Sequence, residues 1–373
     1  MKGVSNKKHS REHVKKVGPT NKRTKVSKSR TRGPSRKTRG LSSSGFVKSQ
    51  ENPIIGPRQE NSWESWQTFN PGAILLGDRV HFLYRAIGED GLSRLGYASS
   101  SDGLTINERL LFPVYEDELG DRIFNTFSYF SGGSFGGAED PRIVRVDDEG
   151  KLYITYTTCY DGLRVALTSI KIDDFLNKKQ GWKKPVLISP PGEVHKNWVI
   201  FPEKIKGKYA ILHSLSPKIS IDYFDSLDFD DDTYVKSYYD SKIKKNRWDG
   251  FLRGAGPVPI KTKYGWLVFY HAMSANDFSK YKVGAMLLSL KDPTKIVARC
   301  PEPILEPDQS YENNGFKAGV VYASGAVVKG GDIFIYYGAA DSYICVASAN
   351  LKEFLDNLMK GARPQLKRKV IKK

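Results

Sequence analysis

Apolar residues in this chain occur in short runs that recur with one layout. Each unit begins with small or proline-containing residues, continues as a strand, turns at Gly or Asp, and returns as a second apolar strand. Short runs rich in Val, Ile, Tyr and Phe between turn residues predict β-strands. The units occupy residues 70–85, 140–156, 201–213, 256–271 and 324–337, and a third strand is expected after most of them, at 94–100, 164–169, 219–223, 283–289 and 344–348.

The repeat predicts an all-β fold, a five-bladed β-propeller. The units begin roughly 55–70 residues apart, a spacing typical of four-stranded blades with long loops. A β-sandwich, the competing all-β fold, would not explain repetition at one period. Near the end of the chain, Leu351, Phe354, Leu355 and Leu358 fall on one face of a predicted helix over 350–360, which we expect to pack on the outside of the propeller.

Positive charge is concentrated at the N-terminus. The chain has 373 residues and a formal net charge of +18, yet residues 1–40 contain 15 Lys or Arg and a single acid, Glu12. Such a segment cannot bury enough apolar surface to offset the entropy of ordering. We therefore predict a disordered basic tail at 1–47, a propeller domain at 48–362 and a basic C-terminal tail at 363–373. Either a weak contact with RNA or another polyanion, or a purely solubilising role, fits the N-terminal tail.

The cysteines and the apolar runs bear on the compartment. Cys159, Cys300 and Cys345 are odd in number and lack the spacing of a metal site. This predicts reduced thiols, a cytoplasmic location and no bound metal. No apolar run reaches the ~18–20 residues of a membrane span, and the N-terminus lacks the apolar core of a secretory signal. We expect no membrane association.

One stretch stands out for its chemistry, Gly137-Ala-Glu-Asp-Pro-Arg142. A glycine-rich run precedes it, and an apolar strand at 143–146 follows it. Pro141 disfavours helical backbone at the preceding residue, so we expect Asp140 in an extended conformation at a rigid strand start. A carboxylate would be held still there, although a salt-bridged turn is the simpler interpretation of these residues taken alone.

Equivalent positions of the five units should meet, because the ends of the inner strands of a propeller converge on one funnel at its axis. These positions are polar or charged where a structural core would be apolar. Two carboxylates would face several cations, and His271 would be a further cation if it is protonated. The strand starts contribute Asn70, Glu139, Asp140, Lys196, Asn197, Arg253 and Ser324, the second-strand ends contribute Arg85, His271 and Asp341, and Arg94 adds a further cation.

The balance of charges favours phosphorolysis over hydrolysis. An inverting glycosidase needs a carboxylate base to activate water across from its acid. Phosphate arrives already anionic, so a phosphorolytic enzyme needs a cationic cradle instead. One acid beside several basic groups fits the second scheme better.

Seven strings along the chain carry a family resemblance. They are Asn70-Pro-Gly-Ala, Leu83-Tyr-Arg-Ala86, Ser93-Arg-Leu-Gly-Tyr-Ala98, Glu139-Asp-Pro-Arg142, Phe201-Pro-Glu-Lys204, Trp266-Leu-Val-Phe-Tyr-His271 and Gly338-Ala-Ala-Asp341. In this order they resemble glycoside hydrolase family 130, the family of β-mannoside phosphorylases. The resemblance implies a five-bladed propeller and reversible phosphorolysis of β-mannosides with inversion, giving α-mannose 1-phosphate. Inorganic phosphate is the implied co-substrate, and no cofactor is implied.

The resemblance also implies roles for single residues. Asp140 stands at the position of the general acid, whose proton passes in that family to the leaving oxygen through the mannose 3-hydroxyl. The mannosyl side is expected to comprise Asn70, Arg85 and Asp341, and we place Arg94, Glu139 and Arg142 beside them. The phosphate side is expected to comprise Lys196, Asn197, Arg253, His271 and Tyr281.

Two positions depart from the family pattern. Ser214 stands where an arginine often helps to bind phosphate, and Arg253 stands where lysine is common. An inverting β-mannosidase on the same scaffold is therefore an alternative function, and a non-catalytic propeller with a polyanion-binding tail is a third. The loops at 111–136 and 222–250 should select the acceptor sugar, with Tyr129 and Trp248 as candidates for stacking. The sequence leaves open the linkage, the acceptor and a homo-oligomeric assembly.

Overall fold

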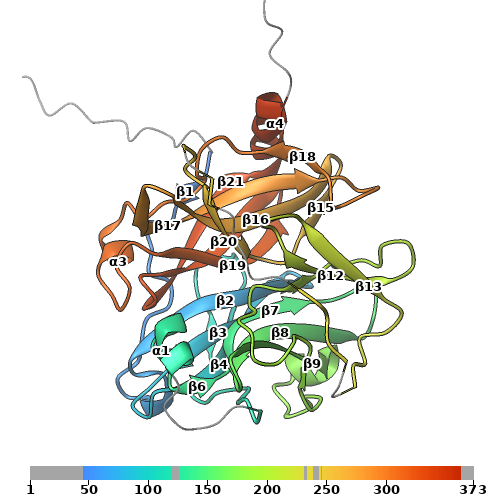
Figure 1. Ribbon diagram of the computed structural model, residues 1–373. Helices are drawn as coiled ribbons and strands as arrows, with labels where there is room; N and C mark the ends of the chain where they lie inside the picture. The colour runs from blue at the N-terminus through green and yellow to red at the C-terminus, as the bar shows by residue number, and fades with distance from the viewer. Residues whose placement is uncertain (1–44, 120–125, 231–232, 238–242, 245, 363–373) are drawn as a thin grey trace, which may run out of the picture. The chain divides into compact units, whose positions relative to one another are not determined.

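Five sheets of mainly antiparallel strands account for most of the chain that the computed structural model describes (Figure 1). The described residues are 45–119, 126–230, 233–237, 243–244 and 246–362, so most of the predicted N-terminal tail and the C-terminal tail lie outside them. Each sheet is built from strands that follow one another in sequence, except that the first strand joins the last sheet. We call these sheets blades 1 to 5.

Blades 1 to 3 follow the first three predicted units. Blade 1 contains β2 (Gln67–Leu76), β3 (Arg79–Ile87), β4 (Leu92–Ser100) and β5 (Glu108–Arg109), with β6 (Gly136–Gly137) added in parallel to β4. Blade 2 contains β7 (Glu139–Val144), β8 (Lys151–Cys159), β9 (Leu163–Lys171) and β10 (Val186–Leu187). Blade 3 contains β11 (Val199–Ile200), β12 (Tyr209–Ser214) and β13 (Ser220–Phe224).

Blades 4 and 5 follow the last two predicted units. Blade 4 contains β14 (Phe251–Ala255), β15 (Ile260–Thr262), β16 (Gly265–Ser274), β17 (Asp277–Leu288) and β18 (Ile296–Arg299). Blade 5 contains β19 (Val321–Lys329), β20 (Asp332–Ala339), β21 (Tyr343–Asn350) and β1 (Val47–Lys48). The helical elements are short apart from the last: η1 (Ser62–Glu64), α1 (Thr126–Gly132), α2 (Ile172–Leu176), α3 (Ser310–Asn313) and α4 (Leu351–Ala362).

The inner strands of all five blades meet, which confirms the five-bladed propeller. A cavity of about 350 Å³ is lined mainly by apolar residues from each blade in turn. They include Ala73 of β2, Ile143 of β7, Pro202 just after β11, Ile260 of β15 and Val327 of β19. Because one cavity contacts every blade, these strands surround a common axis.

The start of the folded chain closes the ring. Val47 of β1 pairs with Ser348 of β21, and Phe46 is buried with its ring 5.0 Å from that of Phe354 in α4. Residues 45–47, which we expected within the tail, therefore belong to the folded part. The prediction that one apolar face of α4 packs on the outside of the propeller is confirmed, since Phe354 and Leu358 are buried against residues of blades 4 and 5.

A buried polar set recurs in three blades and holds the outermost strand. In each, a tyrosine on the second strand donates a hydrogen bond of 2.8–2.9 Å to a fully buried or nearly buried carboxylate from a preceding loop or short helix. A cation on the outermost strand pairs with the same carboxylate at 2.5–2.7 Å. The sets are Tyr84–Glu64–Arg109, Tyr270–Asp249–Arg299 and Tyr337–Glu312–Lys48. The last of them fixes β1, and so the closure of the ring.

Candidate active site

The candidate general acid lies in a bulge at the start of an inner strand. Pairing between β7 and β8 shifts register between Glu139 and Arg142, and Asp140 has a left-handed backbone with φ of 50°. The prediction of an extended Asp140 before Pro141 was therefore wrong. The bulge turns the chain, and aspartate is among the few residues that tolerate left-handed backbone.

The same bulge occurs in blade 1. The register of β2 with β3 shifts between Phe69 and Gly72, and Asn70, which also precedes a proline, has φ of 47°. Asn70 Nδ2 donates a hydrogen bond of 2.7 Å to Asp140 Oδ1. Two equivalent bulges in adjacent blades thus bring an amide and a carboxylate together near the axis, as the repeat predicted.

The charge of Asp140 is set by neighbouring cations. Arg85 Nη1 donates to Asp140 Oδ1 at 3.2 Å, and Arg142 and Lys196 act on the carboxylate through space. Burial by itself raises the pKa of Asp140, but Arg85, Arg142, the amide of Asn70 and Lys196 together hold the pKa below its usual value. Asp140 is therefore ionised at neutral pH in the unliganded protein.

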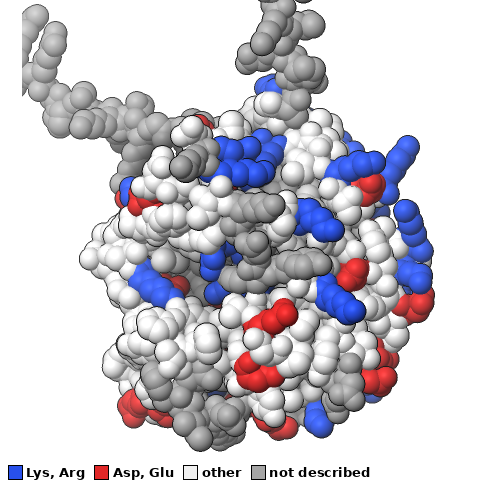
Figure 2. Space-filling model, in the orientation of Figure 1, with Lys and Arg blue, Asp and Glu red and all other residues white. Residues whose placement is uncertain are grey.

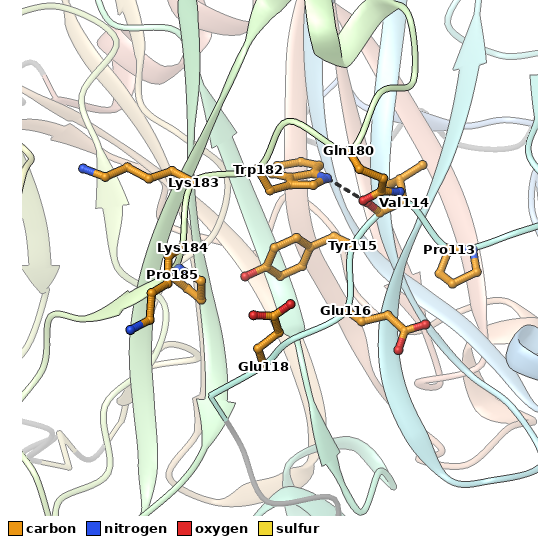
Figure 3. A pocket seen from close by; sticks show the side chains of 10 residues that line it. All are labelled: Pro113, Val114, Tyr115, Glu116, Glu118, Gln180, Trp182, Lys183, Lys184 and Pro185. Carbon is orange, nitrogen blue, oxygen red and sulfur yellow. Dashed lines mark hydrogen bonds between the residues drawn. The ribbon is translucent and has the colours of Figure 1, made fainter.

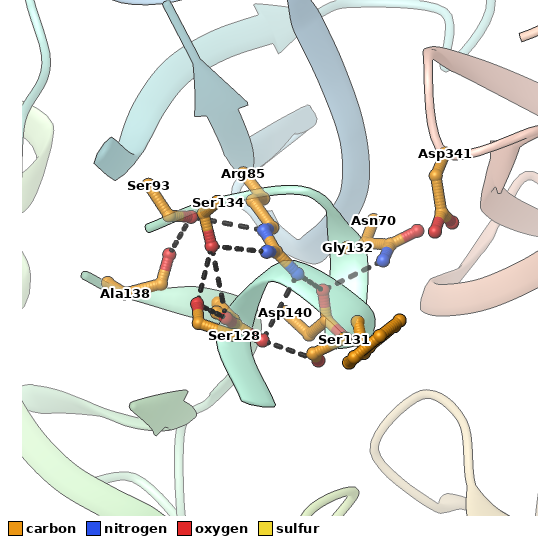
Figure 4. A network of polar contacts seen from close by, with 12 residues as sticks. Asn70, Arg85, Ser93, Ser128, Ser131, Gly132, Ser134, Ala138, Asp140 and Asp341 are labelled. Carbon is orange, nitrogen blue, oxygen red and sulfur yellow. Dashed lines mark hydrogen bonds and ion pairs between the residues drawn. The ribbon is translucent and has the colours of Figure 1, made fainter. Parts of the chain in front are cut away.

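Arg85 is the hub of this polar network (Figure 4). Its guanidinium is fully buried and donates to the hydroxyls of Ser93 at 3.0 Å and Ser134 at 2.9 Å. One of its nitrogens also contacts both Glu139, at 3.3 Å, and Asp140, at 3.2 Å. The sequence therefore correctly predicted that these three charged residues lie close together. It did not predict the serines that hold Arg85 in place.

Asp341 lies on the other side of Asn70 from Asp140 (Figure 4). Burial raises the pKa of Asp341, Lys317 opposes this at 3.2 Å, and the charge of Asp140 raises it further. Asn70 Oδ1 is buried and has no hydrogen-bond partner in the described part of the chain. This oxygen is packed against Gly338, where a Cβ would lie 1.9 Å from it, so the protein encloses it.

His271 is present at the site as a neutral ring. Its Nε2 lies 2.7 Å from the carbonyl oxygen of Ala323, and since a carbonyl can only accept, Nε2 carries the hydrogen. Burial, reinforced by Arg142, lowers the pKa of His271 to about 3. The alternative in which a protonated His271 adds to the cations is therefore wrong. Its Nδ1 is a buried acceptor with no partner among the residues that the structure describes.

Tyr322 belongs to the site and was missed from the sequence. Its ring stacks on His271 with centroids 4.1 Å apart, and the ring of Tyr281 lies 5.9 Å from it. Its hydroxyl accepts from Arg142 at 3.0 Å and donates to Asn197. The fifth predicted unit starts at Ser324, whereas β19 starts at Val321, so Tyr322 lies outside the predicted unit.

The remaining residues predicted on the phosphate side are Lys196, Asn197 and Arg253, and each makes a different kind of contact. Asn197 is buried with φ of 66° and donates through Nδ2 to the carbonyl of Arg253 at 3.1 Å. Lys196 lies within electrostatic range of both Asp140 and His271. Arg253 accepts the bond from Asn197 through its main chain, and its guanidinium lies over the ring of Phe251, at 4.8 Å.

Arg94 forms its ion pairs with residues that are not among the predicted site residues. It pairs with Asp90 at 2.6 Å and with Glu116 at 3.2 Å. Glu116 borders a separate pocket of about 380 Å³ between blades 1 and 2, which Tyr115 and Trp182 also line (Figure 3). None of the predicted site residues lines that pocket.

The surface charge is mixed in sign (Figure 2), and the side chains that could bind a metal are dispersed over the described residues. Both signs of charge are interspersed on the face seen in Figure 2. Within the described ranges, no group of three or more His, Cys, Asp or Glu side chains is arranged to hold a metal ion. No helix in those ranges has the length and apolar content needed to cross a membrane.

An ionised Asp140 among guanidinium and ammonium groups at a propeller axis is suited to acid catalysis on a glycoside, which indicates the class of propeller enzymes that act on glycosides. The chain belongs to glycoside hydrolase family 130. Residues 52–360 match the family model, which is described as β-1,4-mannooligosaccharide phosphorylase. The resemblance seen in the sequence is thereby confirmed.

Individual relatives agree with this assignment. The 1,2-β-oligomannan phosphorylase of Thermoanaerobacter sp. (strain X514) is 38% identical over 318 residues, which cover 81% of this chain and 96% of that protein. The solved complex of β-1,2-mannobiose phosphorylase from Listeria innocua with β-1,2-mannobiose has a TM-score of 0.64 and 25% identity, covering 84% of this chain and 99% of that one. A second solved structure has a TM-score of 0.65 and 26% identity, covering 83% of this chain and 94% of that one. It was reported with the finding that the family contains glycoside hydrolases that target β-1,2 mannosidic linkages in Candida mannan.

Proposed function

We propose that this protein is an inverting β-mannoside phosphorylase. It transfers a β-linked mannosyl group from an oligosaccharide to inorganic phosphate and gives α-mannose 1-phosphate, in a reversible reaction. Its relatives named as phosphorylases, at up to 38% identity, support this activity. The observation that carries the proposal is Asp140, one ionised carboxylate held by Asn70 and surrounded by Arg85, Arg142 and Lys196.

The charges explain why phosphate suits this site as the nucleophile. Phosphate is anionic before it reacts, so it needs cations to bind and aim it rather than a base to deprotonate it. Lys196 supplies a cation within range of Asp140, and His271 Nδ1 supplies an acceptor for a phosphate hydroxyl. On the sugar side, Asp341 is an acceptor suited to mannose hydroxyls.

The proton that the leaving oxygen needs must come through Asp140. The cations keep Asp140 ionised before substrates bind. An anionic phosphate placed beside it neutralises part of their effect and raises its pKa, since like charges disfavour ionisation. Asp140 thus becomes a competent acid only in the ternary complex, with the mannose 3-hydroxyl as the relay that the family resemblance implies.

We assign β-1,2-linked mannosides as the substrate class. The names of the relatives in Thermoanaerobacter and Listeria innocua support this linkage, while the family description names β-1,4-mannooligosaccharides. A panel of β-1,2- and β-1,4-mannooligosaccharides, assayed at equal concentration for sugar phosphate, separates the two. Faster turnover of the β-1,4 series would overturn the assignment.

Hydrolysis is the second candidate, and two observations favour it. Ser214, where the family often has a phosphate-binding arginine, ends β12 and donates its hydroxyl to the carbonyl of Ser216 at 2.8 Å. Asp341 is a second carboxylate near Asp140 with a raised pKa, as a base that activates water would need. Under this alternative, mannose is released at a rate that does not depend on phosphate.

The test of the proposed function is the phosphate dependence of product formation. Purified protein with a β-1,2-mannooligosaccharide should form a sugar phosphate only when phosphate is present, and Asp140→Asn should abolish this while the protein stays folded. Equal release of free mannose with and without phosphate would establish the hydrolase instead. A near-wild-type rate for Asp140→Asn would refute the assignment of the acid.

Two further expectations concern location and partners. A cytoplasmic location is supported by Cys159, Cys300 and Cys345, which are all buried and form no disulfide in the described part of the chain. A polyanion contact through the N-terminal basic tail stays a proposal, because residues 1–44 lie outside the described part. Deleting residues 1–44 should weaken retention on heparin and leave the phosphorylase rate unchanged; lost activity would contradict a separate tail function.

A further inference from the structure

Glu139 is completely enclosed by hydrogen-bond donors of the protein. Its side chain has no exposed surface. One oxygen accepts from Ser128 at 2.5 Å and Ser134 at 3.2 Å, and the other accepts from Ser131 at 2.7 Å and Arg85 at 3.3 Å. A carboxylate so occupied has no surface with which to touch a sugar, although it stands next to the candidate acid in sequence.

These contacts tie helix α1 to the site. Ser128 and Ser131 are three residues apart in α1 and so lie on one face of the helix. At its end, Gly132 packs against Arg85 so closely that a Cβ there would lie 2.6 Å from Nη1. Lys317 holds the same end by donating to the carbonyls of Phe130 and Ser131 at 2.8 and 2.9 Å. Glu139 is thus the anchor of α1 beside Arg85.

Glu139 also competes with Asp140 for one cation. Arg85 Nη1 lies 3.3 Å from Glu139 and 3.2 Å from Asp140, so the guanidinium is shared almost equally. Arg85 is the strongest of the groups that favour the ionised form of Asp140. Without the charge of Glu139, Arg85 would pair with Asp140 alone, and Asp140 would take up a proton less readily.

We infer that Glu139 is a positioning residue for the general acid: by taking part of the charge of Arg85, it keeps Asp140 able to accept a proton, and it anchors α1 over Arg85. This inference rests on the proposed phosphorylase function. The other charged or titratable groups that reach Asp140 or Arg85 are Arg142, Lys196 and Asp341, together with His271 and Tyr322, which are neutral. They are unchanged when Glu139 alone is replaced.

The test is the pH profile of kcat for Glu139→Gln, which removes the charge and keeps the shape. An acid that must be protonated loses activity above its pKa in the complex, so the alkaline limb reports Asp140. We expect this limb to move to lower pH, with kcat above it falling about tenfold per pH unit of displacement. Glu64→Gln is the matched control, because Glu64 is equally buried but bonds Tyr84 and Arg109 outside the site. It should lower stability and leave the limb in place.

Two further variants separate the roles of Glu139. Ser128→Ala with Ser131→Ala keeps the charge and loosens α1, so the KM for the mannoside should rise without movement of the limb. Glu139→Gln with Arg85→Gln removes both members of this buried pair while Asp140 keeps its hydrogen bond from Asn70, so it serves if Glu139→Gln does not fold. The alkaline limb of this double variant should lie at or above that of the wild type, because Arg85, which lowers the pKa of Asp140, is gone.

The outcomes distinguish this inference from the proposed function. A wild-type protein that forms no sugar phosphate refutes the function itself. An active wild type with an unmoved limb in Glu139→Gln, or a double variant whose limb falls below the wild type, overturns the inference about Glu139. A limb displaced to lower pH in Glu139→Gln but not in Glu64→Gln supports it.

Discussion

Replacing Asn70 tests how Asp140 is held at the axis. The amide of Asn70 donates to the ionised Asp140 at 2.7 Å. A hydrogen bond to a charged group contributes about 1.5–3 kcal/mol, so Asn70→Ala should lower kcat/KM by about ten- to a hundredfold. The backbone adds a separate effect on stability, because φ of 47° at residue 70 is left-handed, and such a conformation costs an alanine about 1–2 kcal/mol.

Asn70→Gly is the matched control for this prediction. Glycine adopts left-handed backbone without that cost, while both variants lose the amide. Their kcat/KM values should therefore fall alike, whereas Asn70→Gly should be more stable than Asn70→Ala by about 1 kcal/mol in urea unfolding. Wild-type kcat/KM in both variants would refute the role of the amide. Equal stability of the two would refute the importance of the left-handed bulge.

Three further predictions concern the charges. Because bound phosphate should raise the lowered pKa of Asp140, the alkaline limb of kcat should lie at higher pH than that of kcat/KM; coincident limbs would contradict this. Lys196→Met should raise the KM for phosphate about tenfold or more and the KM for the mannoside much less, measured by varying each substrate in turn; equal effects would place Lys196 elsewhere. Lys48→Met strands the buried carboxylate of Glu312 and should cost about 3–5 kcal/mol in urea unfolding, with Glu312→Gln in the same chain recovering part of it. An unchanged midpoint would show that β1 does not depend on this pair.

The repeat made the architecture predictable. Units of one layout at one period require like sheets, and like sheets converge on an axis, so Asn70, Arg85, Asp140 and Asp341 could be brought together from the sequence alone. The charge balance among them followed from residue type. What the period could not supply was local geometry: Asp140 was expected in extended backbone, and the bulge places it at φ of 50°.

The repeat of strands could not predict the contacts made by irregular segments. Ser128 and Ser131 reach Glu139 from α1, and Lys317 reaches Asp341 from the loop before β19. Such segments have no periodicity to align, so their partners are fixed only when the loops pack. Burial likewise decided the state of His271, because residue type alone allows either a neutral or a charged ring.

The stereochemistry of the first product tests the central claim most directly. Purified protein, a β-1,2-mannooligosaccharide and phosphate can be followed by proton and phosphorus NMR from the first minutes of the reaction. The account predicts α-mannose 1-phosphate as the initial product, none of it without phosphate, and none from Asp140→Asn. Free mannose formed at the same rate in the absence of phosphate, or a β-configured sugar phosphate, would contradict it.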